Sequence, residues 1–257
     1  MTVNETDYEK NQRFNFMVSY FHSVRYKNIV IPLKKLEQEF QDRPINIIDI
    51  GCAHAKLYQV LNSRFNINYT GIEINPVFVE AANSRYSQNQ NFMVIEDSVA
   101  NVLETLKQAD MIVAMESLEH IQEHEVVRIV EAIAAARPKV FICSVPIEIG
   151  PSVWLKNIGS FLSGYIRHTE YSWRETFWAG LYQLDRLPPH DIGHKGFDWR
   201  WLAQTIRHNM KITSIRKLPF KLLPSAVSFS VFITARPMFC PPPTQMVPER
   251  TPHGGDR

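Results

Sequence analysis

Between residues 45 and 145 the sequence alternates between short apolar runs and longer amphipathic runs, and this alternation constrains the fold more than any other feature. The apolar runs indicate strands at 45–50, 67–73, 91–96, 110–115 and 139–145. The intervening runs indicate helices at 54–64, 76–88, 98–106 and 122–136. This pattern predicts a doubly wound parallel sheet with helices on both faces, because its crossovers are right-handed. Such sheets bind ligands beyond the carboxyl ends of their strands.

The regions on either side of this segment differ from it. Residues 7–41 are helix-like in two pieces with a break near Pro32, and 197–209 indicate a further helix. Two strands are expected at 210–218 and 227–236. Residues 147–190 are rich in aromatic side chains and form an insertion after the fifth strand. The proline-rich tail at 237–257 is expected to be disordered.

Composition and charge narrow the class of protein. The formal net charge is only +2, so no strong field holds nucleic acid by phosphate attraction; DNA is not expected as a partner and RNA is disfavoured. Cys52, Cys143 and Cys240 lie far apart without a CxxC pair, which favours a reducing compartment. We see no secretory leader and no apolar run of ~18 residues, so we expect a cytoplasmic protein without a transmembrane segment.

Acidic and small residues that follow the strands are the candidates for ligand contacts. Asp49 and Gly51 end the first strand, where an acid can accept from an amino group and glycine lets the backbone approach a ligand. Glu73 ends the second strand, and a carboxylate there can accept both hydroxyls of a ribose. Asp97 and Ser98 follow the third strand and can contact an adenine amine or cap a helix.

Taken together, these motifs resemble the class I S-adenosylmethionine-dependent methyltransferases, and among them the UbiE/UbiG-like group known as methyltransferase type 11 or 12. DIGCAHAKL stands where that family has an acidic D-x-G-x-G-x-G loop, GIEINP matches its ribose-binding strand end, and SLEHI matches its motif after strand four. The resemblance covers 45–145, and the strand pair at 210–236 matches the family's antiparallel hairpin. It implies a Rossmann-like α/β fold, a doubly wound and mostly parallel sheet of seven strands with one antiparallel strand.

The resemblance also implies S-adenosylmethionine as the cofactor, helices in 1–44 that cover it, a methyltransferase domain at 45–236 and a substrate lid at 147–190. The family's cofactor contacts fall here on Asp49, Gly51, Cys52, Ala53, Glu73, Ile74, Asp97, Ser98, Met115 and Glu116. One departure is that Ala53 and Ala55 replace the second and third glycines, although alanine disfavours positive φ.

On the substrate side, the chain offers histidines and an aromatic insertion. Methyl transfer needs proximity and a dry pocket, and an oxygen nucleophile usually also needs a base. The candidate bases are His120, His190 and His194. The insertion at 147–190 can line an apolar pocket, touch a membrane surface, form a homodimer interface or simply pack as core. We therefore expect O-methylation of a small-molecule or lipid-like metabolite.

Three alternatives remain open. Glu116, Glu119 and His120 form an E-x-x-E-H set that, with His194, resembles the metal site of the Hen1 small-RNA methyltransferases, which methylate a terminal 2′-hydroxyl. Such a set can bind Mg²⁺, Mn²⁺ or a softer ion. The altered loop also allows a methyltransferase-fold binding protein without turnover. A nicotinamide dehydrogenase is least favoured, because its second glycine lets a pyrophosphate touch the backbone.

Overall fold

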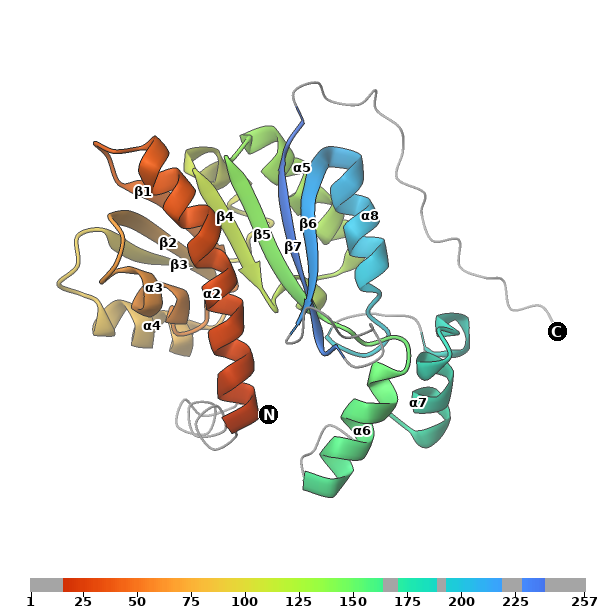
Figure 1. The fold of residues 1–257 in the computed structure, drawn as a ribbon. Coiled ribbons are helices and arrows are strands. Elements are labelled where there is room, and N and C mark those ends of the chain that lie inside the picture. Colours follow the sequence, from red (N-terminus) through yellow and green to blue (C-terminus); the bar gives the residue numbers. More distant parts are fainter. Residues whose placement is uncertain (1–15, 164–170, 189–192, 219–227, 239–257) are drawn as a thin grey trace.

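A seven-stranded sheet forms the centre of the molecule (Figure 1). The computed structural model describes residues 16–163, 171–188, 193–218 and 228–238. The strands are β1 (Ile45–Ile50), β2 (Ile67–Glu73), β3 (Phe92–Glu96), β4 (Met111–Met115), β5 (Val140–Pro146), β6 (Met210–Leu218) and β7 (Ser230–Pro237). Their order is β3-β2-β1-β4-β5-β7-β6. Strand β7 is antiparallel to both neighbours, and the other strands share one direction, which confirms the predicted fold class.

The central strands form because their apolar runs are buried on both faces of the sheet. Every residue of β5 is buried, as expected for a strand with layers on both sides. The chain crosses from one side of β1 to the other between β3 and β4, so the switch point lies between β1 and β4. The carboxyl ends of these two strands are where a doubly wound sheet binds its ligand.

Helices cover the two faces of the sheet and bury two separate clusters. Core residues of α2 (Phe16–Glu39), α3 (Lys56–Leu61) and α4 (Pro76–Arg85) pack on one face. Those of the short helix η1 (Leu103–Gln108), α5 (Glu123–Ala136) and α8 (Trp199–Asn209) pack on the other. Helix α4 begins where Asn75 accepts the N–H of Val77 and Pro76 takes the first helical position, a favourable start.

Two predicted elements were wrong. Helix α2 continues through Pro32 instead of breaking there. Proline removes one helical hydrogen bond, but Ile29, Leu33 and Leu36 are buried against the sheet, and this packing holds both halves in line. The helix predicted at 98–106 is a turn followed by η1, because Asp97 and Ser98 bind nearby backbone N–H groups in the turn.

The residues after β5 form a small helical unit. Helix α6 (Ser152–Ser163) packs against α7 (Trp173–Gly180), and η4 (Leu184–Arg186) follows. In Figure 1 both α6 and α7 extend past the sheet edge at which β5 ends. A side chain at Gly180 would collide with the Trp154 indole, so a glycine is needed where the two helices meet. That this unit is a substrate lid remains a prediction.

The remaining predictions about segments concern residues that the structure describes only in part. The N-terminal region is described from residue 16, and the predicted disordered tail lies outside the described residues apart from Pro237 and Met238. Within the described part of the chain, no helix combines the length and the apolar character that crossing a bilayer requires. The cytoplasmic location stays a prediction.

Candidate active site at the carboxyl edge of the sheet

The loop after β1 keeps a glycine-like backbone although it contains two alanines. Gly51, Ala53 and Ala55 all have positive φ, at 69°, 44° and 52°. A Cβ on Gly51 would lie 2.5 Å from the Cβ of Ser117, so the loop crosses close to the chain that leaves β4. Alanine disfavours positive φ, and the loop is therefore strained at both alanines. Each adopts the left-handed region at a cost of roughly 1–2 kcal/mol.

Ala53→Gly is expected to stabilise the fold by about 0.5–1 kcal/mol, because glycine adopts this positive φ without strain. Urea unfolding measures the change. Ala81→Gly in α4 is the matched control and should destabilise by about 1 kcal/mol, because glycine in a helix interior loses backbone entropy. A loss of stability in Ala53→Gly would show that the loop is not strained.

Glu73, at the end of β2, closes this loop. Its Oε2 accepts the N–H of Ala53 at 2.9 Å, and its Oε1 accepts the N–H groups of Ile74 and Asn75 at 3.1 and 3.0 Å. A carboxylate has about four acceptor sites, so these three bonds leave capacity for a ligand hydroxyl. The side chain of Ile74 is 72% exposed beside it, which leaves an apolar surface next to the carboxylate.

Asp49 is buried beneath the loop. Its Oδ2 accepts the hydroxyl of Tyr69 at 2.6 Å, and only 4% of the residue is exposed. Burial raises the pKa of Asp49 to about 7, and the charge of Glu73 adds to this, while the Tyr69 hydrogen bond acts the other way. Sequence reasoning missed Tyr69. The strand register could have revealed it: Gly71 pairs with Asp49, so the ring of Tyr69, two residues earlier, can reach the Asp49 carboxyl.

This pKa predicts a pH dependence of stability. Between about pH 4 and pH 7 the folded protein holds a proton on Asp49 that the unfolded chain has released, so this group makes stability fall as pH rises through that range. Relative to Asp49→Asn, the wild type should lose up to about 4 kcal/mol across the window. Urea midpoints of both proteins at several pH values test this. Parallel curves would contradict it.

Asp97 and Ser98 lie after β3, on the same edge. The N–H of Asp97 donates to the carbonyl of Glu73 at 3.1 Å, so the two strand ends are tied together. Asp97 Oδ1 accepts the N–H of Ser98 and the side-chain amide of Asn101. The predicted helix cap is therefore wrong: these bonds stabilise a turn, and η1 begins after Val102 without a side-chain cap. Contact with an adenine stays a prediction.

The end of β4 brings further polar groups to this edge. Glu116 follows Met115 with a φ of 55° and forms an ion pair with Arg25 of α2 at 3.2 Å. The same oxygen, Oε1, accepts the hydroxyl of Ser144 on β5. Ser117 donates its hydroxyl to the carbonyl of Ile50, which ties β4 to β1. Helix α2 is thereby fixed at the site by an ion pair.

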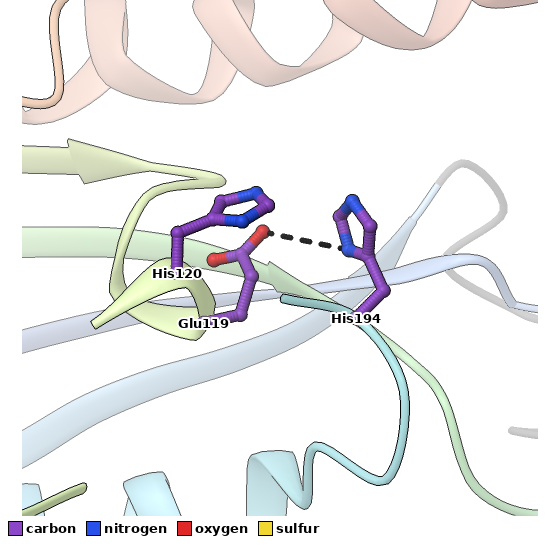
Figure 2. Close-up of side chains that lie close together, drawn as sticks. All are labelled: Glu119, His120 and His194. Atoms are coloured by element: carbon purple, nitrogen blue, oxygen red, sulfur yellow. Dashed lines mark ion pairs between the residues drawn. The ribbon is translucent and has the colours of Figure 1, made fainter. Parts of the chain in front are cut away.

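Glu119, His120 and His194 come together next to these residues (Figure 2). Glu119 and His120 lie on the short helix η2 (Leu118–His120), and His194 comes from the loop before α8. One ligand atom from each lies within 4.8 Å of the others. The two imidazole rings meet edge to face with centroids 4.9 Å apart, and the N–H of Gly193 donates to the Glu119 carbonyl.

Glu119 is the buried member of this cluster. Its side chain has no exposed surface, whereas that of His194 is 31% exposed, and His194 Nδ1 lies 3.9 Å from Glu119 Oε1. Neither carboxyl oxygen accepts a hydrogen bond from another described residue. Burial, and next the charge of Glu116, hold the pKa of Glu119 well above its ordinary value. A buried carboxyl group with exposed imidazoles beside it is typical of a functional site.

The structure thus brings together two of the three predicted histidines. His120 and His194 are adjacent, and His190 lies outside the described residues. Three of the four residues in the metal alternative share one cluster, whereas Glu116 is paired with Arg25. The sequence placed helices of residues 1–44 over the cofactor but did not reveal the pairing of Arg25 with Glu116, because the two residues are far apart in sequence.

Comparisons with known proteins match a domain within this chain and its fold. Residues 47–137 match a family model described as a methyltransferase domain. No curated protein matches the chain significantly.

Solved structures of methyltransferases share the fold. The methyltransferase domain of bacterial CtHen1 is 16% identical, with 84% of this chain and 98% of that chain covered and a TM-score of 0.58. Magnesium protoporphyrin IX methyltransferase from Synechocystis PCC 6803, solved with bound SAH, is 14% identical, with 91% and 96% covered and a TM-score of 0.54. A structure of WbdD is 15% identical, with 82% and 40% covered and a TM-score of 0.52.

The UbiE/UbiG-like subgroup stays a prediction, since these matches are broader than that group. The matched region contains the loop after β1 and Glu73, the acid that ends β2. It also contains or adjoins strands that set the sheet order. On this evidence residues 47–137 match a methyltransferase domain, and the chain has the fold of the S-adenosylmethionine-dependent methyltransferases, enzymes whose methyl donor is S-adenosylmethionine.

Proposed function

We propose that this enzyme methylates a hydroxyl oxygen of a small-molecule or lipid-like acceptor, with His194 as the base that Glu119 orients. The observation that supports it is the cluster at the end of β4, where a fully buried carboxyl group lies 3.9 Å from an accessible imidazole. A base must be positioned by a neighbour to take a hydroxyl proton efficiently.

The residues at the carboxyl edge fit the cofactor. Glu73 has acceptor capacity for a ribose hydroxyl, and the exposed side chain of Ile74 offers an apolar surface to the nucleoside. The loop with three positive-φ residues turns sharply beside them. When bound, S-adenosylmethionine supplies an electrophilic methyl group on a sulfonium sulfur. We assign its nucleoside to the ends of β2 and β3, and its methionine part to the loop after β1.

The chain's own residues act on the acceptor. With Nδ1 turned toward Glu119, the Nε2 of His194 is the atom that takes the hydroxyl proton. His120 packs against the His194 ring and restricts its rotation. The ion pair between Arg25 and Glu116 keeps α2 over this edge, which helps to exclude water.

The helical unit after β5 supports an apolar acceptor. Its exposed side chains include Trp173 at 71%, Phe177 at 51% and Leu155 at 46%. The unit is also joined to the histidine loop: Lys195 pairs with Glu175 of α7 at 2.8 Å, and the hydroxyl of Tyr171 accepts the N–H of Gly196 at 2.9 Å. An acceptor held by this unit would therefore lie beside His194.

A second candidate, a metal-dependent RNA 2′-O-methyltransferase, is favoured by the same cluster. One carboxylate and two imidazoles are a donor set that suits Mn²⁺, Fe²⁺ or Zn²⁺ better than Mg²⁺. The buried oxygens of Glu119 lack donors among the described residues other than Glu119 itself, so they fit a cation. Glu119, His120 and His194 would hold the ion, which would act as a Lewis acid. The CtHen1 domain shares the fold.

The experiment is a transfer assay with labelled S-adenosylmethionine. Acceptors are lipid and polar metabolite extracts and, separately, short RNAs with a free 3′ end. Each is assayed with EDTA and with added Mn²⁺, using wild type, His194→Ala and the exposed control His124→Ala. We expect label in a metabolite fraction, no effect of EDTA, and loss only in His194→Ala.

Label in RNA that requires Mn²⁺ would overturn the first function and establish the second. A binding test separates the two without turnover. If the cluster holds a metal, titration with Mn²⁺ should show one site in the wild type, lost in Glu119→Gln and kept in His124→Ala, with release of a proton because the pKa of Glu119 is raised. If His194 acts as a base without metal, no such site appears.

A further inference from the structure

A groove between α2 and the β6–β7 hairpin lies away from the active site. Its volume is about 330 Å³, which lies at the lower end of the range for small-molecule sites. It opens over Val140, the first residue of β5, and over Thr234. The active-site edge is at the other end of β5, where Pro146 pairs with Ser230. The groove is therefore not part of the cofactor or acceptor site.

Basic side chains line the groove, and no acidic side chain does. Lys35 of α2, Arg216 of β6 and Arg236 of β7 all line it, and no aspartate or glutamate does. The guanidinium of Arg216 is fixed because its Nη1 donates to the side chain of Asn28 at 2.9 Å. No ion pair of Lys35 or Arg236 is found among the described residues, so their charges are available to a ligand.

The strand register adds a further positive charge. Lys211 is the cross-strand partner of Arg236, so the two side chains lie on the same face of the hairpin. Directly opposed like charges destabilise an antiparallel pair unless an anion lies between or beside them. The nearest acid on the groove side of α2 is Glu39, one turn beyond Lys35, and it is paired with Lys139. The groove therefore has a net positive charge.

Apolar side chains form the remaining wall. Ile31, which is 49% exposed, and Pro32 of α2 line the groove, and Phe232 of β7, which is only 2% exposed, lies beneath it. A bare inorganic anion would leave this surface uncovered, whereas a phosphate ester with a ring or an alkyl part would contact both walls. Arginine side chains suit phosphate because their planar fork donates two hydrogen bonds to its oxygens.

From this combination we propose that the groove between α2 and the β6–β7 hairpin binds a phosphorylated small molecule, with its phosphate on Lys35, Arg216 and Arg236 and its apolar part on Ile31 and Pro32. The proposal is independent of the acceptor that the enzyme methylates. It gives the protein a second ligand site at the opposite end of the sheet.

Calorimetric titration with naphthyl phosphate tests the proposal, with inorganic phosphate, sulfate and an oligouridylate as comparisons. We expect one site for naphthyl phosphate, weaker binding of phosphate and sulfate, and a roughly tenfold loss of affinity in Arg236→Gln and in Lys35→Gln. Lys34→Gln is the control, because this exposed residue precedes Lys35 but does not line the groove. Unchanged binding of S-adenosylhomocysteine would show that the variants are folded.

Three results would overturn the proposal. The first is no binding of naphthyl phosphate to the wild type. The second is equal binding to the wild type and to both groove variants, which would mean association elsewhere. The third is binding of the oligouridylate alone, which would identify a nucleic-acid surface instead of a small-molecule site. None of these results depends on methyl transfer, so failure here is distinct from failure of the proposed function.

Discussion

His194→Ala is expected to slow methyl transfer by roughly 10²–10⁴-fold, the usual contribution of a general base. The side chain of His194 is accessible, and its Nδ1 faces the buried Glu119 at 3.9 Å, so the substitution removes the proposed base. The proposed function places this side chain on the acceptor side, so affinity for S-adenosylhomocysteine should be unchanged. Steady-state rates and calorimetric titration of the same preparation provide the two readouts.

Glu119→Gln separates positioning from chemistry. Glutamine keeps the size of the side chain and removes a buried ionisable group whose pKa is raised, so the variant should be at least as stable as the wild type. We expect a lower kcat with little change in KM. His124→Ala, an exposed change on α5, should leave the rate unaltered. A full rate in His194→Ala would remove the proposed base, whatever the result with Glu119.

Glu73→Ala is expected to weaken binding of S-adenosylhomocysteine by about 1–3 kcal/mol. The carboxylate has two tasks: it accepts the proposed ribose hydroxyl, and its Oε2 accepts the N–H of Ala53 at 2.9 Å. Without it, Ala53 loses its hydrogen bond to the end of β2. Calorimetric titration measures the change, with Glu80→Ala on the exposed face of α4 as control.

Glu73→Gln refines this result. The glutamine amide can accept through only one oxygen, and its NH₂ group would face backbone N–H groups, so we expect a loss almost as large as that of Glu73→Ala. Wild-type affinity in both variants would show that the ribose is bound elsewhere.

The centre of the sheet was readable from the sequence because β1, β4 and β5 are short apolar runs buried on both faces. The predicted bounds of β1, β2 and β6 match the structure, and the other strands differ by three residues or fewer at each end. The closing hairpin was predicted from the family resemblance, and β7 is antiparallel as expected. Each of these features depends on local pattern and on the topology rules for parallel sheets.

What the sequence did not reveal depends on tertiary contacts. Pro32 reads as a break, but buried neighbours keep α2 continuous. Ala53 reads as incompatible with a positive φ, but the bond to Glu73 contributes to holding it there. The distance from His194 to Glu119 follows from how the loop before α8 crosses η2, since Gly193 donates to the Glu119 carbonyl. No local spacing predicts that crossing.

The most direct test of the account is a crystal structure of the complex with S-adenosylhomocysteine. The quantity to measure is the distance from the cofactor sulfur to the nearest imidazole nitrogen of His194. The account predicts about 6 Å, because an acceptor oxygen must fit between them at reacting distance from the methyl group and within hydrogen-bond reach of the base. The ribose should lie on Glu73. A sulfur that points away from the Glu119, His120 and His194 cluster would contradict the account.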